Sequence, residues 1–272
     1  MKKIKFLSLA LILVLGVLTT SCLSSSSGSQ DGGVGGGMVK VYESYNSTSG
    51  IVMQSIDGYV IYPTAQSVAS LSAQGKNISQ MVGRVVYALY SVDAIGVDET
   101  TKVLSDVNLI NYYDLSEKLN VIDATRAEAL LNPDVYGNVS GNAAIVSMNV
   151  GEDKPVLMFD QYTLMLPINH WMKKTENELT LNYFKNDIEE NGVLTLYLSY
   201  NEGNTVSSSA TYTSLELYGY GYRGLYTYFY DLTPILLQMP LDGDIEKIRI
   251  VAMKNESGLI SGAEEVVYEV IC

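Results

Sequence analysis

Cysteine and histidine are scarce in this chain of 272 residues. It has two cysteines, Cys22 and Cys272, and one histidine, His170, beside its single tryptophan. A lone histidine cannot by itself build a His-based catalytic metal site, and no Cys/His cluster has the spacing of a zinc site. A Ser-His-Asp triad would have to use His170, but no serine lies in a G-x-S-x-G elbow. We therefore expect no metal, no cofactor and no catalytic residue, and a structural or incidental role for His170.

Basic residues are also few. Lysine and arginine number 17 against 30 acidic residues, so the formal net charge is −13. A surface this acidic repels phosphate backbones and anionic headgroups. The composition therefore argues against nucleic-acid partners and against electrostatic binding to a membrane. One enzyme class stays open, because acidic residues far apart in sequence can meet in space as the carboxylate pair of a glycoside hydrolase.

What the sequence does contain is clearest at its N-terminus. Lysines precede an apolar run over residues 6–18, which is the pattern of a secretory signal and is too short to span a bilayer as a helix. The letters LTTSC end at Cys22, and a serine-rich tail follows, an arrangement that resembles a bacterial lipoprotein box. The resemblance implies that residues 1–21 are removed as a signal peptide and that Cys22 carries acyl chains of the palmitate type. Several chains on one residue anchor a protein stably; an ordinary cleaved signal is the alternative.

Lipidation of Cys22 would also settle the disulfide question. A lipidated Cys22 has no thiol, so no intramolecular disulfide can form, although an exported protein would tolerate one. Cys272 is then a small buried hydrophobic residue or a free thiol, and the first is the commoner state. Loss of residues 1–21 removes three lysines, which leaves 14 basic residues against 30 acidic ones and a net charge of −16.

The lipid anchor predicts a place in the cell envelope. Leu23 follows Cys22, and the tail behind it holds no acidic run, so neither inner-membrane retention nor surface export is signalled. We therefore expect an outer-membrane lipoprotein that faces the periplasm, with surface display as the alternative.

Short strand-like runs fill the rest of the chain and predict an all-β protein. Residues 22–37 are rich in serine and glycine and are expected to form a flexible tether. Residues 38–119 hold about five strand signals, with a hairpin turn at Asp57-Gly58 and one short helix near the letters AQSVASL. This combination favours a small OB-like β-barrel.

A break in the strand pattern separates two predicted domains. Within residues 120–138, Asp123 can cap a short helix that Pro133 ends, so we interpret this segment as a connector. Residues 139–272 then contain roughly eight or nine strand signals separated by polar turns, a spacing typical of a β-sandwich.

Tyrosines alternate in the stretch YGYGYRGLYTYFYDL. If the chain is extended on both sides of a turn at Arg223-Gly224, the tyrosines share one face of a hairpin, and leucine and phenylalanine share the other. We expect the Leu/Phe face to form the sandwich core and the tyrosine face to point outward. The candidate partner-binding surface then consists of Tyr218, Tyr220, Tyr222, Tyr226, Tyr228 and Tyr230.

Two interpretations of these tyrosines remain open. Tyrosine is a good strand former, and cross-strand aromatic pairs stabilise a sheet by about 0.2–1 kcal/mol each, which requires no ligand. Exposed tyrosine rows also supply rigid contact area and hydroxyl groups, and their ring faces stack on sugars. The second interpretation predicts an envelope protein or glycan as the partner.

The order of these segments resembles a known family. The lipoprotein box and tether precede the letters DGYVIYPTAQSVASL, GRVVYALYSVD and VNLINYYDL, and the second half contains ELTLNYFKND, YTYFYDLTPI and DIEKIRIVAMKN. This order is similar to that of the NigD-like lipoproteins of gut-type Gram-negative bacteria over nearly all of the mature chain. The resemblance implies an OB-like N-terminal domain and a C-terminal β-sandwich. It brings no catalytic residues.

The function that these observations predict is a non-enzymatic, lipid-anchored binding or assembly module of the cell envelope. The bacteriocin locus that names the NigD-like family implies an immunity-type role as one alternative. An envelope glycan-binding protein or hydrolase is the other.

Overall fold

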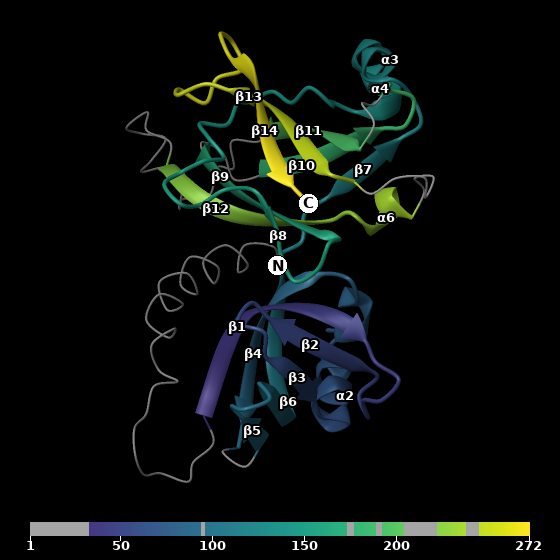
Figure 1. Cartoon of the computed structure of the whole chain (residues 1–272), viewed down its shortest axis with the longest axis vertical. Helices are drawn as coiled ribbons and strands as arrows, with labels where there is room; N and C mark the ends of the chain where they lie inside the picture. Colours follow the sequence, from purple (N-terminus) through teal and green to yellow (C-terminus); the bar gives the residue numbers. More distant parts are fainter. Residues whose placement is uncertain (1–32, 94–95, 173–176, 189–191, 204–221, 238–244) are drawn as a thin grey trace. The chain divides into compact units, whose positions relative to one another are not determined.

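The structure, a computed structural model, describes residues 33–93, 96–172, 177–188, 192–203, 222–237 and 245–272 (Figure 1). The chain divides into a first unit that ends at Leu115 and a second unit that begins at Ser116. Both units are built mainly from β-strands, which confirms the all-β class. No helix among the described residues is long and apolar enough to cross a membrane.

The first unit is a closed β-barrel. Its described elements are β1 (Gly33–Glu43), β2 (Ile51–Ser55), β3 (Val60–Pro63), α2 (Ala65–Ala73), the 3-10 helix η1 (Ile78–Met81), β4 (Val85–Val92), β5 (Val97–Asp98) and β6 (Val103–Asp114). Antiparallel pairing joins β3 to β2, β2 to β1, β1 to β4 and β4 to β6, and parallel pairing of β3 with β6 closes the ring. This closed order, with α2 between β3 and β4 in the sequence, confirms the predicted OB-like barrel (Figure 1).

Local signals in the first unit act as predicted. Gly58 has a φ of 84° in the turn that joins the antiparallel strands β2 and β3. The Thr64 side chain caps α2 by accepting a hydrogen bond from the backbone N–H of Ser67. The helix buries Val68 and Leu71 against the barrel core, a spacing of three residues that puts both on one helical face.

The glycine-rich start of β1 differs from the expected tether. Residues 33–37 form regular antiparallel pairs with Val92–Ala88 of β4. The ring of Tyr90 lies over Gly35, where a Cβ atom would come within 3.2 Å of the ring. Glycine therefore permits a close approach in this strand, and composition alone does not reveal that role.

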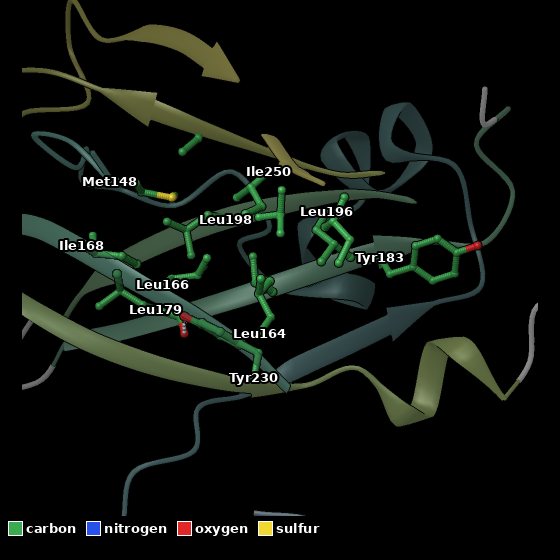
Figure 2. Close-up of a cluster of buried hydrophobic side chains, with 14 of the residues drawn as sticks. Met148, Leu164, Leu166, Ile168, Leu179, Tyr183, Leu196, Leu198, Tyr230 and Ile250 are labelled. Carbon is green, nitrogen blue, oxygen red and sulfur yellow. Dashed lines mark hydrogen bonds between the residues drawn. The ribbon is translucent and has the colours of Figure 1, made fainter. Parts of the chain in front are cut away.

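The second unit is a β-sandwich. Its described elements are β7 (Leu119–Ile122), α3 (Arg126–Leu131), α4 (Pro133–Tyr136), β8 (Val156–Leu157), β9 (Thr163–Met172), β10 (Asn177–Phe184), β11 (Val193–Glu202), β12 (Tyr222–Asp231), α6 (Thr233–Leu236), β13 (Lys247–Lys254) and β14 (Glu264–Ile271). A five-stranded sheet has the order β14-β13-β11-β10-β7, and a three-stranded sheet has the order β12-β9-β8. Figure 2 shows Leu164 and Leu166 of β9 among the residues that share one buried cluster with Leu179 and Leu196 of the larger sheet.

Residues 120–138 belong to the second unit and do not form the expected connector. Strand β7 pairs in parallel with β10, and Ile122 and Ala129 share a buried cluster with Phe184. The segment is thus a short edge strand followed by two short helices, of which α3 buries Ala129 against the sheet. The boundary between the units lies earlier, between Leu115 and Ser116.

The cap of α3 also differs from the expectation. The side chain of Thr125, rather than that of Asp123, accepts a hydrogen bond from the backbone N–H of Glu128. The Glu128 carboxylate in turn accepts from the backbone N–H of Thr125, which completes a capping box. Pro133 stops α3 as predicted and opens the short helix α4.

The tyrosines of β12 face the opposite way from the expectation. Tyr230 is fully buried in the sandwich core and Tyr228 packs against it, whereas Leu225 is 39% exposed and Thr227 is exposed. Phe229, on the same face as Leu225 and Thr227, is buried as expected. Strand β12 pairs with β9 along its whole length. Burial suits these rings because the Tyr230 hydroxyl donates to the backbone oxygen of Leu179 at 3.1 Å, so an apolar ring and a satisfied polar tip fill the core together (Figure 2).

Substitutions on the two faces of β12 should separate these orientations. Tyr230→Ala should lower the free energy of unfolding by about 3–5 kcal/mol because it empties a buried aromatic site. Tyr230→Phe should cost about 1 kcal/mol for the lost hydrogen bond. Thr227→Ala, on the exposed face, should stay within about 0.5 kcal/mol of the parent. Urea unfolding measures all three, and a small effect of Tyr230→Ala would put the ring back on the surface.

Candidate functional site

A depression on the outer side of the barrel is the candidate functional site. It has a volume of about 210 Å³ and lies where the loop between β1 and β2 meets the seam of β3 and β6. The residues that line this barrel depression are Asn46, Ser47, Thr48, Tyr62, Pro63, Thr64, Ser105 and Asp106. A second hollow near α3 is much smaller, with a volume of about 40 Å³. Beside that hollow, Arg126 is already paired with Glu265 at 2.7 Å.

A β-bulge places Asp106 at the barrel depression. Ile61 pairs with Leu104, but Pro63 pairs with Val107, so β6 carries one extra residue at this point. Regular alternation would turn Val107 outward, whereas the bulge buries both Leu104 and Val107 in the barrel and leaves Asp106 exposed. Asp106 has a φ of 53°, a left-handed conformation that aspartate and asparagine adopt more readily than most residues.

The loop between β1 and β2 is held in shape by its own hydrogen bonds. The backbone N–H of Ser44 donates to the oxygen of Gly50, and that of Gly50 donates to the oxygen of Ser47, both at 3.0 Å. The hydroxyl groups of Ser47 and Ser49 lie 2.8 Å apart and hydrogen-bond. One wall of the barrel depression is therefore a loop whose backbone has little freedom to move.

Four side chains around the barrel depression keep their polar atoms free. No described residue hydrogen-bonds to the side chain of Asn46, Thr48, Tyr62 or Asp106. All four residues line the same hollow, and their side chains carry an amide, two hydroxyl groups and a carboxylate. The remaining hydroxyls are already engaged, since Thr64 caps α2 and the Ser105 hydroxyl donates to the backbone oxygen of Gly96 at 3.4 Å.

The tyrosines predicted as a partner-binding surface do not form one in β12. Tyr226, Tyr228 and Tyr230 point toward the sandwich interior. Tyr222 opens the strand, and nothing is described of its side chain. Tyr218 and Tyr220 lie outside the described residues, as does Cys22.

An aromatic cluster surrounds His170 in the sandwich. The ring of His170 lies 5.0 Å from that of Tyr200, 5.1 Å from Tyr226 and 5.9 Å from Tyr228, measured between ring centres. Its Nε2 atom hydrogen-bonds with the Tyr228 hydroxyl at 2.6 Å. Gly224 stands opposite His170 in the strand pair, and a Cβ atom there would come within 2.8 Å of the Tyr226 ring. Glycine at this position therefore makes room for the cluster.

Burial keeps His170 neutral. The side chain has no exposed area, and its Nδ1 atom has no hydrogen-bond partner among the described residues. The backbone of Trp171 favours the charged form of the ring, but the desolvation that burial causes is the larger influence. Burial accordingly lowers the pKa of His170 from 6.5 to about 4. The expected structural role of His170 agrees with this position inside the core.

Sequence reasoning missed the residues of the barrel depression. Tyr62 stands in an apolar strand run and carries no motif. The one signal at Asp106 is the pair of adjacent polar residues between Leu104 and Val107, which breaks the alternation at the bulge. Of the two alternatives for Cys272, the structure shows the free thiol, which is exposed at the end of edge strand β14. The described residues contain no group of three or more histidine, cysteine or acidic side chains arranged to hold a metal ion.

Comparisons with known proteins place the fold. No protein-family model and no curated protein matches this sequence. The chain is similar to a predicted lipoprotein from Bacteroides fragilis, at 19% identity and a TM-score of 0.56, over 88% of this chain and 98% of the other. It is also similar to a NigD-like immunity protein from Bacteroides caccae, at 13% identity and a TM-score of 0.47, over 88% of this chain and 98% of the other. A protein of unknown function from Bacteroides vulgatus has 13% identity and a TM-score of 0.46, over 88% and 91%. At 19% identity, the likeness to the Bacteroides fragilis protein concerns the fold alone.

Acid should destabilise the protein through His170. The pKa of His170 is about 4 in the folded state and about 6.5 in the unfolded state, so between these values the unfolded chain binds more protons. The stabilising contribution is fully present above pH 6.5 and is lost as the pH falls toward 4. From pH 7 to pH 5 the loss is about 2 kcal/mol.

The control for this prediction is His170→Gln, which cannot titrate. Urea unfolding of both proteins at pH 7 and pH 5 should show that the substitution removes about 2 kcal/mol of the pH dependence, whatever it does to the absolute stability. An equal pH dependence in the two proteins would contradict the lowered pKa.

Proposed function

We propose that this protein is a non-enzymatic lipoprotein, held in the outer membrane by acyl chains on Cys22 and facing the periplasm, that binds an envelope component at the barrel depression. The observation that carries the proposal is the convergence of free polar side chains on one preformed hollow. Such a concave site with a few convergent polar groups is the usual form of a ligand site.

The anchoring half of the proposal rests on the N-terminal sequence. The charged start, the apolar run and the letters LTTSC occur in the order of a lipoprotein signal. A lipoprotein of similar fold, the one predicted in Bacteroides fragilis, is in line with this anchoring. From Cys22 to the first strand residue Gly33 the chain can span at most about 40 Å, so the barrel would work close to the membrane surface.

The chemistry of the barrel depression supports binding rather than hydrolysis. A glycosidase needs two carboxyl groups that flank the bond to be cleaved. Among the described residues that line the hollow, Asp106 alone has a carboxylate. The expected tyrosine surface offers no alternative site in β12, because its rings are part of the core.

Membrane fractionation tests the anchor. Cys22→Ala should move the protein from the detergent-extracted membrane fraction to the soluble periplasmic fraction, because the sulfur that carries the first acyl chain is gone. Cys272→Ala is the matched control and should leave the protein in the membrane fraction. If the Cys22→Ala protein stays with the membrane as firmly as the parent, the lipid anchor is not at this residue.

Capture from the native envelope tests the binding site. The full chain should retain an envelope component that Asp106→Asn and Tyr62→Phe retain less well, because the first substitution replaces a charged acceptor by a neutral amide and the second removes a hydroxyl from a lining residue. Asparagine tolerates the left-handed backbone at position 106, so the bulge should persist.

Two substitutions outside the hollow serve as controls for the capture. Tyr45→Phe changes a tyrosine of the same loop that is 92% exposed and does not line the hollow. Asp57→Asn changes a carboxylate in the turn between β2 and β3 of the same barrel, where Asn-Gly forms an equally good turn. Retention that is the same for all five proteins would remove the barrel depression from the function.

A further inference from the structure

We infer that the barrel depression takes a neutral, hydroxyl-rich ligand, namely one ring of an envelope saccharide. This ligand class presupposes the proposed binding function of the same hollow. The inference follows from which hydrogen-bonding groups are free there, which charges are present and how much space they enclose.

The free groups match a partner that both donates and accepts hydrogen bonds. The Asn46 amide and the hydroxyls of Thr48 and Tyr62 each offer a donor and an acceptor, and the Asp106 carboxylate offers acceptors. A sugar hydroxyl also does both, and two neighbouring hydroxyls can share one carboxylate. The Tyr62 ring adds apolar surface next to its hydroxyl, which suits a sugar ring with apolar and polar parts.

The charge of the hollow disfavours the other small polar ligands. No lysine or arginine is among the residues that line it, and Asp106 is negative, so a phosphate or a carboxylate would be repelled. An ammonium or guanidinium group would pair with Asp106 but carries donors only, so it would leave the donors of Asn46, Thr48 and Tyr62 without acceptors. A neutral polyhydroxyl ligand uses all four side chains.

The size of the hollow sets the length of ligand that it can hold. Its volume of about 210 Å³ falls below the roughly 300–1,000 Å³ of pockets for drug-sized ligands. One sugar ring is therefore the unit that enters. Further rings of a longer saccharide would pass over the exposed loop residues on either side.

The walls of the hollow are prepared before any ligand arrives. The loop between β1 and β2 is fixed by its internal hydrogen bonds, and the bulge in β6 fixes the backbone of Asp106. Thr64 is held at the N-terminus of α2, directly after Tyr62 and Pro63. Little order has to be created on binding, which lowers the cost of recognising a small ligand.

Saturation-transfer NMR on the full chain carrying Cys22→Ala tests this ligand class. The probes are glucose, galactose and N-acetylglucosamine, each at millimolar concentration, with methylguanidinium and inorganic phosphate as charged probes of similar or smaller size. At least one neutral sugar should receive saturation on its ring protons. Asp106→Asn and Tyr62→Phe should each weaken its binding by about tenfold, because the first replaces a charged hydrogen-bond acceptor by a neutral amide and the second removes a hydroxyl.

The same controls, Tyr45→Phe and Asp57→Asn, should bind the sugar within about twofold of the parent, a free-energy change of a few tenths of a kcal/mol. Binding of methylguanidinium in place of every sugar would overturn the ligand class in favour of a cationic partner, and binding of phosphate would overturn the charge argument. The saccharide inference would also be overturned if no sugar binds, or if sugar binding is the same in the parent and in both Asp106→Asn and Tyr62→Phe. If envelope capture depends on the hollow but no sugar binds, the proposed function survives and the saccharide does not; if neither depends on the hollow, both fail.

Discussion

The parallel pairing of β3 with β6 is the contact on which the first unit and its candidate site depend. A hairpin cannot make it, because parallel neighbours need a crossover connection, here the segment that contains α2, β4 and β5. Closure removes the exposed edges that an open sheet would leave. The extra residue in β6 then lets Leu104 and Val107 both enter the core. The same irregularity that completes the packing of the barrel therefore exposes Asp106 beside Tyr62.

In the second unit, tyrosine side chains fill much of the space between the two sheets of the sandwich. Its inner faces must fill a space between two sheets, and large rings do so efficiently, but each ring brings a hydroxyl that needs a partner. Tyr230 satisfies this need at the backbone oxygen of Leu179, Tyr200 at the backbone oxygen of Trp171, and Tyr228 at His170. The histidine is neutral in this setting, so it serves the core as a hydrogen-bonding ring and makes the fold sensitive to acid.

An OB-like barrel and a sandwich occur in proteins of many functions, so the architecture does not by itself specify one. What distinguishes this chain is the contrast between polar groups that are satisfied and polar groups that are free. Around the barrel depression, the Ser47 hydroxyl hydrogen-bonds with Ser49 in the loop, and the Thr64 hydroxyl accepts a hydrogen bond at the start of α2. The side chains of Tyr62 and Asp106 are left for a partner. These two side chains stand on backbone that is held rigidly, yet neither forms a hydrogen bond within the described residues, so we place the candidate site there.

Much of the fold could be predicted from local sequence because its signals are local. Turn residues at Asp57-Gly58 gave the β2–β3 hairpin, the pattern AQSVASL gave α2, and strand spacing gave a barrel followed by a sandwich. The short segment 120–138 was harder, because a four-residue edge strand has no period of its own and is recognised only by its partner β10. The faces of β12 were harder still. Alternation shows that tyrosine lies opposite leucine and phenylalanine, but tyrosine suits both a core and a surface.

The sequence by itself determined the all-β class and the succession of the two architectures, because both depend on patterns among neighbouring residues. It also predicts an export signal with a candidate lipid site at Cys22. Tertiary structure decided which face of β12 is buried, since that depends on the space between two sheets and on the acceptor at Leu179. It also decided the site. Asn46, Tyr62 and Asp106 come from three separate segments, and only closure of the barrel with a one-residue bulge brings their polar groups to one hollow.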